Sequence, residues 1–431
     1  MPGRRLLLIA AEFPPRGGGG VLRVTKLVKY LSRLGWEITV ICSDEPPSET
    51  DDPTLLEQVS SARILRVRGP LRSLGAAAKS AVEERRSRRG GRFLWDAARS
   101  FARAFAIPDR WIGWSRAVAR LSADQLGNPD VIVSSGPPHS GHIAARSISR
   151  RLGVPFFVDL RDDWAGNPLF ASSAPWRTPI DRVLERRALR DAAGIVVVSE
   201  ASQALYAARY PSLAGRIHVI HNGFDREDLP TSAVRAPSDG RVHFLHAGSL
   251  RYAQRDPGPF FDAFGQAAGA NPALVLHLLG SISPSNEARA RTVISGQSLS
   301  IDGFVSHDEA LRRMADADVL VVISSVSESG AGALTGKIFE CLAAGRPLLL
   351  IAPPGPASDL VREADGGVIA RPTDVPGLTS AILSLAANAG SYSGPRSEVL
   401  MRFDRGLQTK AWNDLLASHK RPNTDVGSRK T

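Results

Sequence analysis

Short apolar runs alternate with helical patterns in two successive series along this chain of 431 residues. Such alternation is typical of β–α–β units, which build parallel sheets covered by helices. The first series predicts strands at Leu6–Ala10, Glu37–Ile41, Arg63–Val67, Val131–Ser134, Pro155–Asp159, Gly194–Val198 and Ile217–Ile220, with helices such as Leu22–Leu34, Ser140–Leu152 and Pro179–Ala192 between them. The second predicts strands at Val242–His246, Ala273–Leu279, Ser298–Asp302, Asp318–Ile323 and Pro347–Ile351. We therefore expect an α/β protein of two Rossmann-like domains, whose ligands bind at the carboxyl ends of the strands.

The break between the two series sets the expected domain boundaries. A chain of this length exceeds the size at which one hydrophobic core stops growing. Residues 230 to 240 are rich in Pro, Ser, Thr and Gly, as linkers tend to be. We expect domains at 1–228 and 241–396 around a linker at 229–240, followed by a helix at 397–418 and a disordered tail at 419–431.

Composition indicates a globular protein of a reducing compartment. Hydrophobic residues are 43% and charged residues 23%, an ordinary balance. The two cysteines, Cys42 and Cys341, lie beside or within apolar runs and are interpreted as buried thiols. The apolar run Leu6–Ala11 meets Glu12 too early for a signal peptide, and no 18 apolar residues run together. We expect a cytoplasmic protein.

The excess positive charge is concentrated in one segment. Residues 63 to 120 contain fifteen Arg or Lys and four Asp or Glu, a surplus equal to the whole net charge of +11. Within it, Phe93, Phe101 and Phe105 recur at helical spacing opposite a set of arginines, namely Arg92, Arg99 and Arg103. A basic amphipathic helix of this kind favours an anionic membrane surface. A solvated basic face without a partner is the alternative, and nucleic-acid binding is disfavoured because no recognition motif accompanies the charge.

A glycine-rich turn follows the first predicted strand. Gly17 to Gly20 precede a helix that carries Arg23, and glycines there let the backbone approach a ligand while the helix-start amides attract negative charge. The spacing is not that of a dinucleotide-binding fingerprint, so a nicotinamide or flavin cofactor is disfavoured. A plain flexible turn is the alternative interpretation.

Polar residues also follow two later strands of the first domain. His139 and His142 come just after Val131–Ser134, where the ligand-binding edge should lie. Asp159, Arg161 and Asp162 follow the next strand, and charges so close together require partners. These carboxylates could form a structural ion pair with Arg161, or organise an active site.

In the second domain, the segment Thr335–Glu340 reads Thr-Gly-Lys-Ile-Phe-Glu and opens an amphipathic helix after the predicted strand Asp318–Ile323. The first-turn amides and Lys337 could face a diphosphate. Glu340, three residues later on the same face, could accept hydrogen bonds from a ribose diol. An exposed Lys–Glu pair on an ordinary helix is the alternative.

The segment resembles the donor-binding helix of family-4 glycosyltransferases, in which a GK-[IL]-FE motif is followed by LAAG and a basic residue before Pro. Residues 157 to 164 are similar to the D-x-R-D-P-W motif of a bacterial subgroup, with Asp163 in place of Pro. The family's Glu-x7-Glu pattern is incomplete, because Gly332 takes the position of the first Glu and only Glu340 remains. This difference leaves the contacts to the donor sugar open, and Glu328 could substitute only with a rearranged loop.

The resemblance implies a GT-B fold, in which the two domains face each other across a cleft and the C-terminal helix returns to the first domain. It implies catalytic roles for His139, Arg255 and Lys337. The donor-binding residues implied by the motifs are Gly18, Gly19, Gly20, Gly248, Ser249, Phe304, Val305, Thr335, Gly336 and Glu340. Acceptor contacts or active-site organisation are implied for Arg23, His142, Asp159, Arg161, Asp162 and the hinge residue Asn222.

The expected activity is retaining transfer of a hexose from a nucleotide diphosphate sugar to an acceptor hydroxyl, in the synthesis of an envelope polysaccharide or glycolipid. The sequence contains no metal-ligand motif, and we expect no cofactor or essential metal because cationic side chains would stabilise the leaving diphosphate. Expected partners are the donor, a lipid-linked or glycan acceptor and an anionic membrane surface, but no nucleic acid. A sugar-nucleotide epimerase of the same fold and a donor-binding protein without transfer activity are the alternatives.

Overall fold

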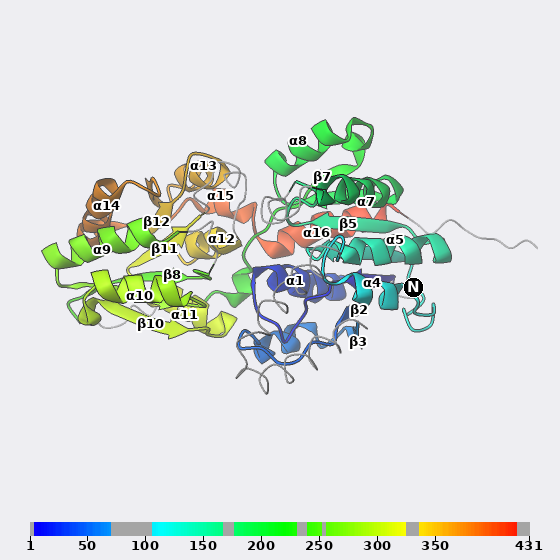
Figure 1. Cartoon of the computed structure of the whole chain (residues 1–431), viewed down its shortest axis with the longest axis horizontal. Helices are drawn as coiled ribbons and strands as arrows, with labels where there is room; N and C mark the ends of the chain where they lie inside the picture. The colour runs from blue at the N-terminus through cyan, green and yellow to red at the C-terminus, as the bar shows by residue number, and fades with distance from the viewer. Residues whose placement is uncertain are drawn as a thin grey trace, which may run out of the picture.

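The computed structural model describes residues 4–69, 106–166, 176–230, 239–251, 256–324 and 336–419. These residues form two parallel sheets, one in each half of the chain, flanked by helices (Figure 1). The first sheet has seven strands in the order β3-β2-β1-β4-β5-β6-β7, and the second has six in the order β10-β9-β8-β11-β12-β13. The predicted pair of Rossmann-like domains is confirmed.

The N-terminal domain places its helices on both faces of the seven-stranded sheet. Its strands are β1 (Arg5–Ile9), β2 (Glu37–Ser43), β3 (Arg63–Val67), β4 (Val131–Gly136), β5 (Phe156–Leu160), β6 (Gly194–Val197) and β7 (Ile217–Val219). Its helices are α1 (Gly19–Arg33), α4 (Ile112–Ala119), α5 (Ser140–Leu152), α7 (Arg177–Asp191) and α8 (Glu200–Arg209). One core packs α4, α5, α7 and α8 against one face of the sheet, and a second core packs α1 against the other. Both faces of each central strand are buried, which explains their continuous apolar runs.

The C-terminal domain repeats this arrangement. Its strands are β8 (Val242–Ala247), β9 (Leu274–Leu279), β10 (Leu299–Gly303), β11 (Val319–Ile323), β12 (Leu348–Ile351) and β13 (Gly367–Ala370). Its helices are α9 (Gly258–Ala270), α10 (Pro284–Val293), α11 (His307–Asp316), α12 (Gly336–Ala343), α13 (Pro356–Glu363) and α14 (Val375–Asn388). The sequence did not predict β13, because this edge strand has only four residues and a short apolar run.

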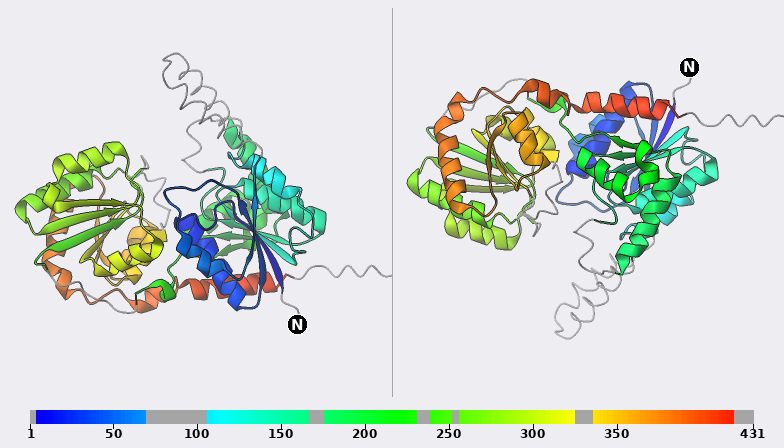
Figure 2. Two further views of the ribbon diagram at one scale, coloured as in Figure 1. Left: turned by 90° about the horizontal axis from the view of Figure 1, so that it is seen from below. Right: turned by 90° about the horizontal axis from the view of Figure 1, so that it is seen from above.

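The chain crosses between the domains a second time near its end. The single helix predicted at 397–418 is instead two helices, α15 (Ser397–Met401) and α16 (Arg405–Ala417). They separate because Phe403 and Asp404 pair with the first crossing: the Phe224 amide donates to the Phe403 carbonyl over 3.1 Å, and the Arg405 amide donates to the Phe224 carbonyl over 2.9 Å. Figure 2 shows α16, in red, beside the N-terminal domain. Its Trp412 is buried in the core that contains α1. The two crossings therefore hold each other at the hinge.

Both cysteines are buried and free, as expected. Burial raises the pKa of Cys42 to about 11 and that of Cys341 to about 12, so neither is a thiolate at neutral pH. Among the described residues, we find no helix with the length and apolar character needed to span a membrane.

Candidate active site

A buried arginine joins three strand ends of the N-terminal domain. Arg23, on α1, forms an ion pair of 2.8 Å with Asp159, whose side chain sits at the carboxyl end of β5. Its guanidinium also donates to the backbone carbonyl of His221 over 2.8 Å and to Asn222 Oδ1 over 3.3 Å. Ser135 Oγ donates to the second Asp159 oxygen over 2.8 Å. Arg23 is 5% exposed and Asp159 is fully buried. This cluster is therefore a buried polar network whose hydrogen bonds are already formed without a ligand.

Arg161 lies at the carboxyl end of β5, close to the glycine-rich turn. Of the two carboxylates that could pair with it, Asp159 forms its ion pair with Arg23. Arg161 donates to the backbone carbonyls of Gly136, the last residue of β4, and of Pro137, which follows it. Its guanidinium fills the space that a side chain at Gly20 would require. The glycine-rich turn and the strand-end arginine are thus in direct contact, and removal from water lowers the pKa of Arg161.

The two histidines lie together beside Trp164. Strand β4 ends where Pro137 and Pro138 remove amide donors, and α5 begins after them. His139 stacks on Trp164 with ring centroids 5.0 Å apart and planes 4° from parallel. His142 Nδ1 lies 2.8 Å from Ser134 Oγ. Burial lowers the pKa of His142 to about 3, and burial followed by the neighbouring His142 lowers that of His139, so both rings are neutral at pH 7.

Asp163 stands where the D-x-R-D-P-W motif has proline, and it connects the segment after β5 to α8. Its carboxylate forms a two-point ion pair with Arg209, with distances of 2.7 and 2.8 Å. Tyr206 accepts the Trp164 amide over 3.0 Å and donates to Asp163 over 3.0 Å. Arg209 also contacts the fully buried Glu185 of α7. This network fixes the backbone of Trp164, and thereby the ring on which His139 stacks.

The C-terminal side of the site centres on the start of α12. Lys337 Nζ lies 3.0 Å from Glu340 Oε2, one turn later. Burial is the largest single influence and opposes the charge of each group, but the surrounding charges and the hydrogen bond between the two groups together outweigh it, which raises the pKa of Lys337 and lowers that of Glu340. Both groups are therefore charged at neutral pH. Lys337 keeps about a third of its side chain exposed, whereas Glu340 is only 5% exposed.

Two other predicted donor loops also reach strand ends. Gly248 and Ser249 follow β8, and the Gly248 amide donates to the Leu279 carbonyl over 2.8 Å. Phe304 follows β10 and lies against Gly17 of the N-terminal domain, where an added Cβ would come within 2.8 Å of its ring. Val305 packs against the core beneath α12. The loop after β10, which is predicted to bind the donor, and the glycine-rich turn thus meet across the domains.

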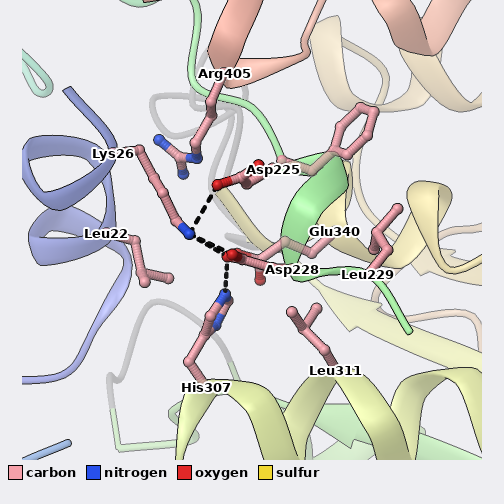
Figure 3. A pocket seen from close by; sticks show the side chains of 10 residues that line it. Leu22, Lys26, Asp225, Asp228, Leu229, His307, Leu311, Glu340 and Arg405 are labelled. Atoms are coloured by element: carbon pink, nitrogen blue, oxygen red, sulfur yellow. Dashed lines mark hydrogen bonds and ion pairs between the residues drawn. The ribbon is translucent and has the colours of Figure 1, made fainter. Parts of the chain in front are cut away.

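A small pocket between the domains contains charged side chains that the sequence did not reveal (Figure 3). Lys26 is 2% exposed and contacts both Asp225, at 2.9 Å, and Asp228. Asp228 also accepts a hydrogen bond of 3.2 Å from Nε2 of His307 in α11, so one carboxylate connects the two domains. Glu340 lines the same pocket. No sequence signal marks Lys26, Asp225, Asp228 or His307, because their burial follows only from domain packing.

Several predicted residues cannot be placed. Arg255, Thr335, Gly332 and Glu328, together with the aromatic and basic residues from Arg92 to Phe105, lie outside the described residues. Of the remainder, the structure brings Gly20, Arg23, Asp159, Arg161 and Asn222 together on the N-terminal side. Gly18 and Gly19 form the start of α1 beside them, and Gly336 begins α12. The roles assigned to all of these residues stay predictions.

Comparison with known proteins agrees with this architecture. The model of the Glycosyl transferase 4-like domain matches residues 18–223, and that of Glycosyl transferases group 1 matches residues 241–388. No curated protein matches the sequence. Similar solved structures include Anabaena HepE in complex with UDP and glucose (TM-score 0.66, 17% identity, 96% of this chain and 100% of that chain covered). Sucrose-phosphate synthase of Thermosynechococcus elongatus is also similar (TM-score 0.67, 17% identity, 96% of this chain and 100% of that chain covered). So is a glycosyltransferase of Rickettsia africae (TM-score 0.62, 14% identity, 96% of this chain and 98% of that chain covered). These likenesses confirm the predicted GT-B fold.

Proposed function

Because the chain belongs to the family-4-like GT-B glycosyltransferases, we propose that it transfers a sugar from a nucleotide diphosphate sugar to the hydroxyl group of an acceptor. The Lys337–Glu340 pair at the start of α12 is the observation that carries this proposal. It lies in the segment after β11, on the domain that such enzymes use for the donor. Anabaena HepE, a structural neighbour, has been solved with UDP-glucose, which supports a donor of this class.

The donor is held by charge on one side and by hydrogen bonds on the other. Lys337, Arg255 and the first amides of α12 face the diphosphate, where positive charge stabilises the oxygens that become negative as the glycosidic bond breaks. Glu340 is charged, and its carboxylate can accept more hydrogen bonds than the one from Lys337. It can therefore accept hydrogen bonds from the two hydroxyl groups of a ribose. The neutral imidazole of His139 contacts a hydroxyl group of the sugar.

Transfer then exchanges one carbon–oxygen bond for another. The bond between the anomeric carbon and the diphosphate breaks, and the acceptor oxygen bonds to the same carbon from the same face, which retains the configuration. The acceptor proton passes to the departing phosphate oxygen. Arg23, Asp159 and Arg161 organise the acceptor side through the preformed contacts described above.

An acceptor of the cell envelope, carried on a lipid or as a glycan, is consistent with the basic segment from Arg63 to Arg120. That surplus charge would hold the enzyme on the cytoplasmic face of the membrane. Such an acceptor would enter the N-terminal side of the cleft.

Two measurements test the proposal. Thermal shift with a panel of UDP-, GDP- and dTDP-sugars identifies the donor, since a ligand that binds only the folded state raises the melting temperature. Incubation with the labelled donor then separates the possible activities by product. A sugar bonded to an acceptor supports the proposal, whereas an epimerised donor or binding without turnover contradicts it.

A further inference from the structure

Arg405 is a buried cation without a partner in the described part of the chain. It begins α16 and is only 7% exposed, yet its guanidinium forms no ion pair or hydrogen bond with any described residue. In Figure 3 it reaches into the pocket between the domains with no dashed line, unlike Lys26 and His307. Because a buried charge is costly unless it is paired, this arginine requires an explanation.

The backbone of Arg405 is fixed at the hinge. Its amide donates to the Phe224 carbonyl over 2.9 Å, and the preceding residue, Asp404, forms an ion pair of 2.9 Å with Arg226. Asp404 also caps α16 by accepting from the Leu407 amide over 2.9 Å. The Arg405 side chain therefore extends into the pocket from a fixed point between the domains.

Two of the three carboxylates that line this pocket already have basic partners. Asp225 forms ion pairs with Lys26 at 2.9 Å and with Lys29 at 2.7 Å. Asp228 contacts Lys26 and accepts a hydrogen bond of 3.2 Å from His307 Nε2. The charge of both carboxylates is thus compensated by positive charge other than that of Arg405.

The third carboxylate, Glu340, has a partner that donor binding would draw away. Its ion pair, of 3.0 Å, is with Lys337, which is proposed to face the donor diphosphate. When Lys337 does so, Glu340 becomes a carboxylate of 5% exposure in need of another cation, and Arg405 lines the same pocket. Burial lowers the pKa of Arg405, and among the charges that oppose this effect the charge of Glu340 has the largest influence. Glu340 is therefore the carboxylate with which Arg405 interacts most strongly.

We propose that Arg405 is a positioning residue for the nucleotide: it compensates the charge of Glu340 when Lys337 turns to the diphosphate, and it orients this carboxylate toward the ribose hydroxyl groups. A carboxylate has about four acceptor positions, so Glu340 can accept a guanidinium and two hydroxyl groups together. The inference rests on the proposed function, because Glu340 must contact the ribose. It adds to the donor site a residue of α16, a helix that packs against the N-terminal domain.

A double-mutant cycle in the ligand-free protein tests whether Arg405 and Glu340 interact. Arg405→Gln should not lower the midpoint of urea unfolding, because the guanidinium is buried without a bonded partner. Glu340→Gln should lower the midpoint in the parent, and should lower it less in the Arg405→Gln background, where no buried cation depends on the carboxylate. The matched control is Arg402→Gln, whose pair with Glu363 is half exposed on both sides and whose effect should add to that of Glu340→Gln.

Isothermal titration with UDP and 2′-deoxy-UDP tests the positioning role, with GDP and 2′-deoxy-GDP in their place if the parent prefers GDP. A hydrogen bond to a charged group is worth about tenfold or more in Kd, so the parent should bind the 2′-deoxy form more weakly by about that factor. Arg405→Gln should weaken the ribonucleotide by a similar factor and the 2′-deoxy form much less, which brings the ratio of the two Kd values toward one. Arg405→Lys keeps the charge but not the planar fork, and should recover part of the affinity. Arg402→Gln should change neither Kd.

Three results would overturn the inference. The first is a sharp fall in the unfolding midpoint of Arg405→Gln, which would assign the arginine a structural role. The second is additivity of Arg405→Gln and Glu340→Gln in the cycle, which would show that the two groups do not interact. The third is equal weakening of the ribonucleotide and its 2′-deoxy form in Arg405→Gln, because a general disturbance of the site would leave their ratio unchanged. A parent that binds neither UDP nor GDP would contradict the proposed function instead, and the cycle in the ligand-free protein would still decide whether Arg405 and Glu340 interact.

Discussion

The two sides of the candidate site differ in how completely the protein satisfies its own charges. On the N-terminal side, Arg23 is nearly inaccessible and bonds to Asp159, two backbone carbonyls and Asn222. On the C-terminal side, Lys337 has one carboxylate partner and keeps a third of its side chain exposed. The first arrangement holds a shape before any ligand arrives. The second keeps charge available for a ligand, which is consistent with the proposed role of Lys337 in binding the donor diphosphate.

This contrast predicts that the N-terminal cluster matters most for stability. Arg23→Ala leaves Asp159 buried without its partner, and breaking a buried pair in this way costs about 3–5 kcal/mol. The midpoint of urea unfolding should therefore fall sharply. Arg33→Ala is the matched control on the same helix, because its pair with Glu227 is half exposed on both sides and such pairs contribute about 0–1 kcal/mol. Equal loss in both variants would contradict the distinction between the two clusters.

On the same side of the site, Gly20→Ala should lower the catalytic rate without unfolding the protein. The new methyl group displaces the Arg161 guanidinium, and a catalytic group misplaced by about 1 Å can cost about 100-fold in rate. The fold should survive, since alanine is favoured over glycine within a helix by about 1 kcal/mol. Gly269→Ala, in α9 of the C-terminal domain, is the control, because no atom lies near the added Cβ. Full kcat/KM in the Gly20 variant would show that the position of Arg161 is unimportant.

On the C-terminal side, substitutions should weaken donor binding. Lys337→Ala, Arg255→Ala and Glu340→Ala each remove a charge-assisted hydrogen bond worth about 1.5–3 kcal/mol, so the donor Kd should rise on the order of tenfold or more. Isothermal titration measures this directly. Lys410→Ala, at an exposed lysine of α16, should leave the Kd unchanged. If all three site variants bind donor as the parent does, the donor assignment is wrong.

The smallest effect is expected at Gly332. We interpret this glycine as a feature of a subgroup that positions the donor sugar differently, so restoring the family's acid should not improve the enzyme. Turnover of Gly332→Glu should be no higher than that of the parent in a product assay. A large gain would instead indicate that the chain is a degraded enzyme whose C-terminal side lost a working contact.

Much of the fold could be predicted because its signals are local. Strands such as β4 and β11 are continuous apolar runs since parallel strands are buried on both faces. The break between α15 and α16 could not be predicted, because it depends on pairing between Phe224 and residues 403 to 405, about 180 residues away in sequence. The missed strand β13 likewise gains its hydrogen bonds only from its neighbour β12.

The candidate site likewise has features that the sequence predicts and features that depend on the tertiary structure. The sequence alone determined which polar residues stand at strand ends and helix starts, because chain order and hydrophobic period decide those positions: Arg161 after β5 and Lys337 at the start of α12 are examples. Tertiary structure alone decided which charges meet. It paired Asp159 with Arg23 instead of Arg161, bound Asp163 to Arg209, and buried Lys26 against Asp228 and His307 between the domains. The reason is that a buried charge requires a partner, but the partner is selected by proximity in the folded chain, which no local pattern records.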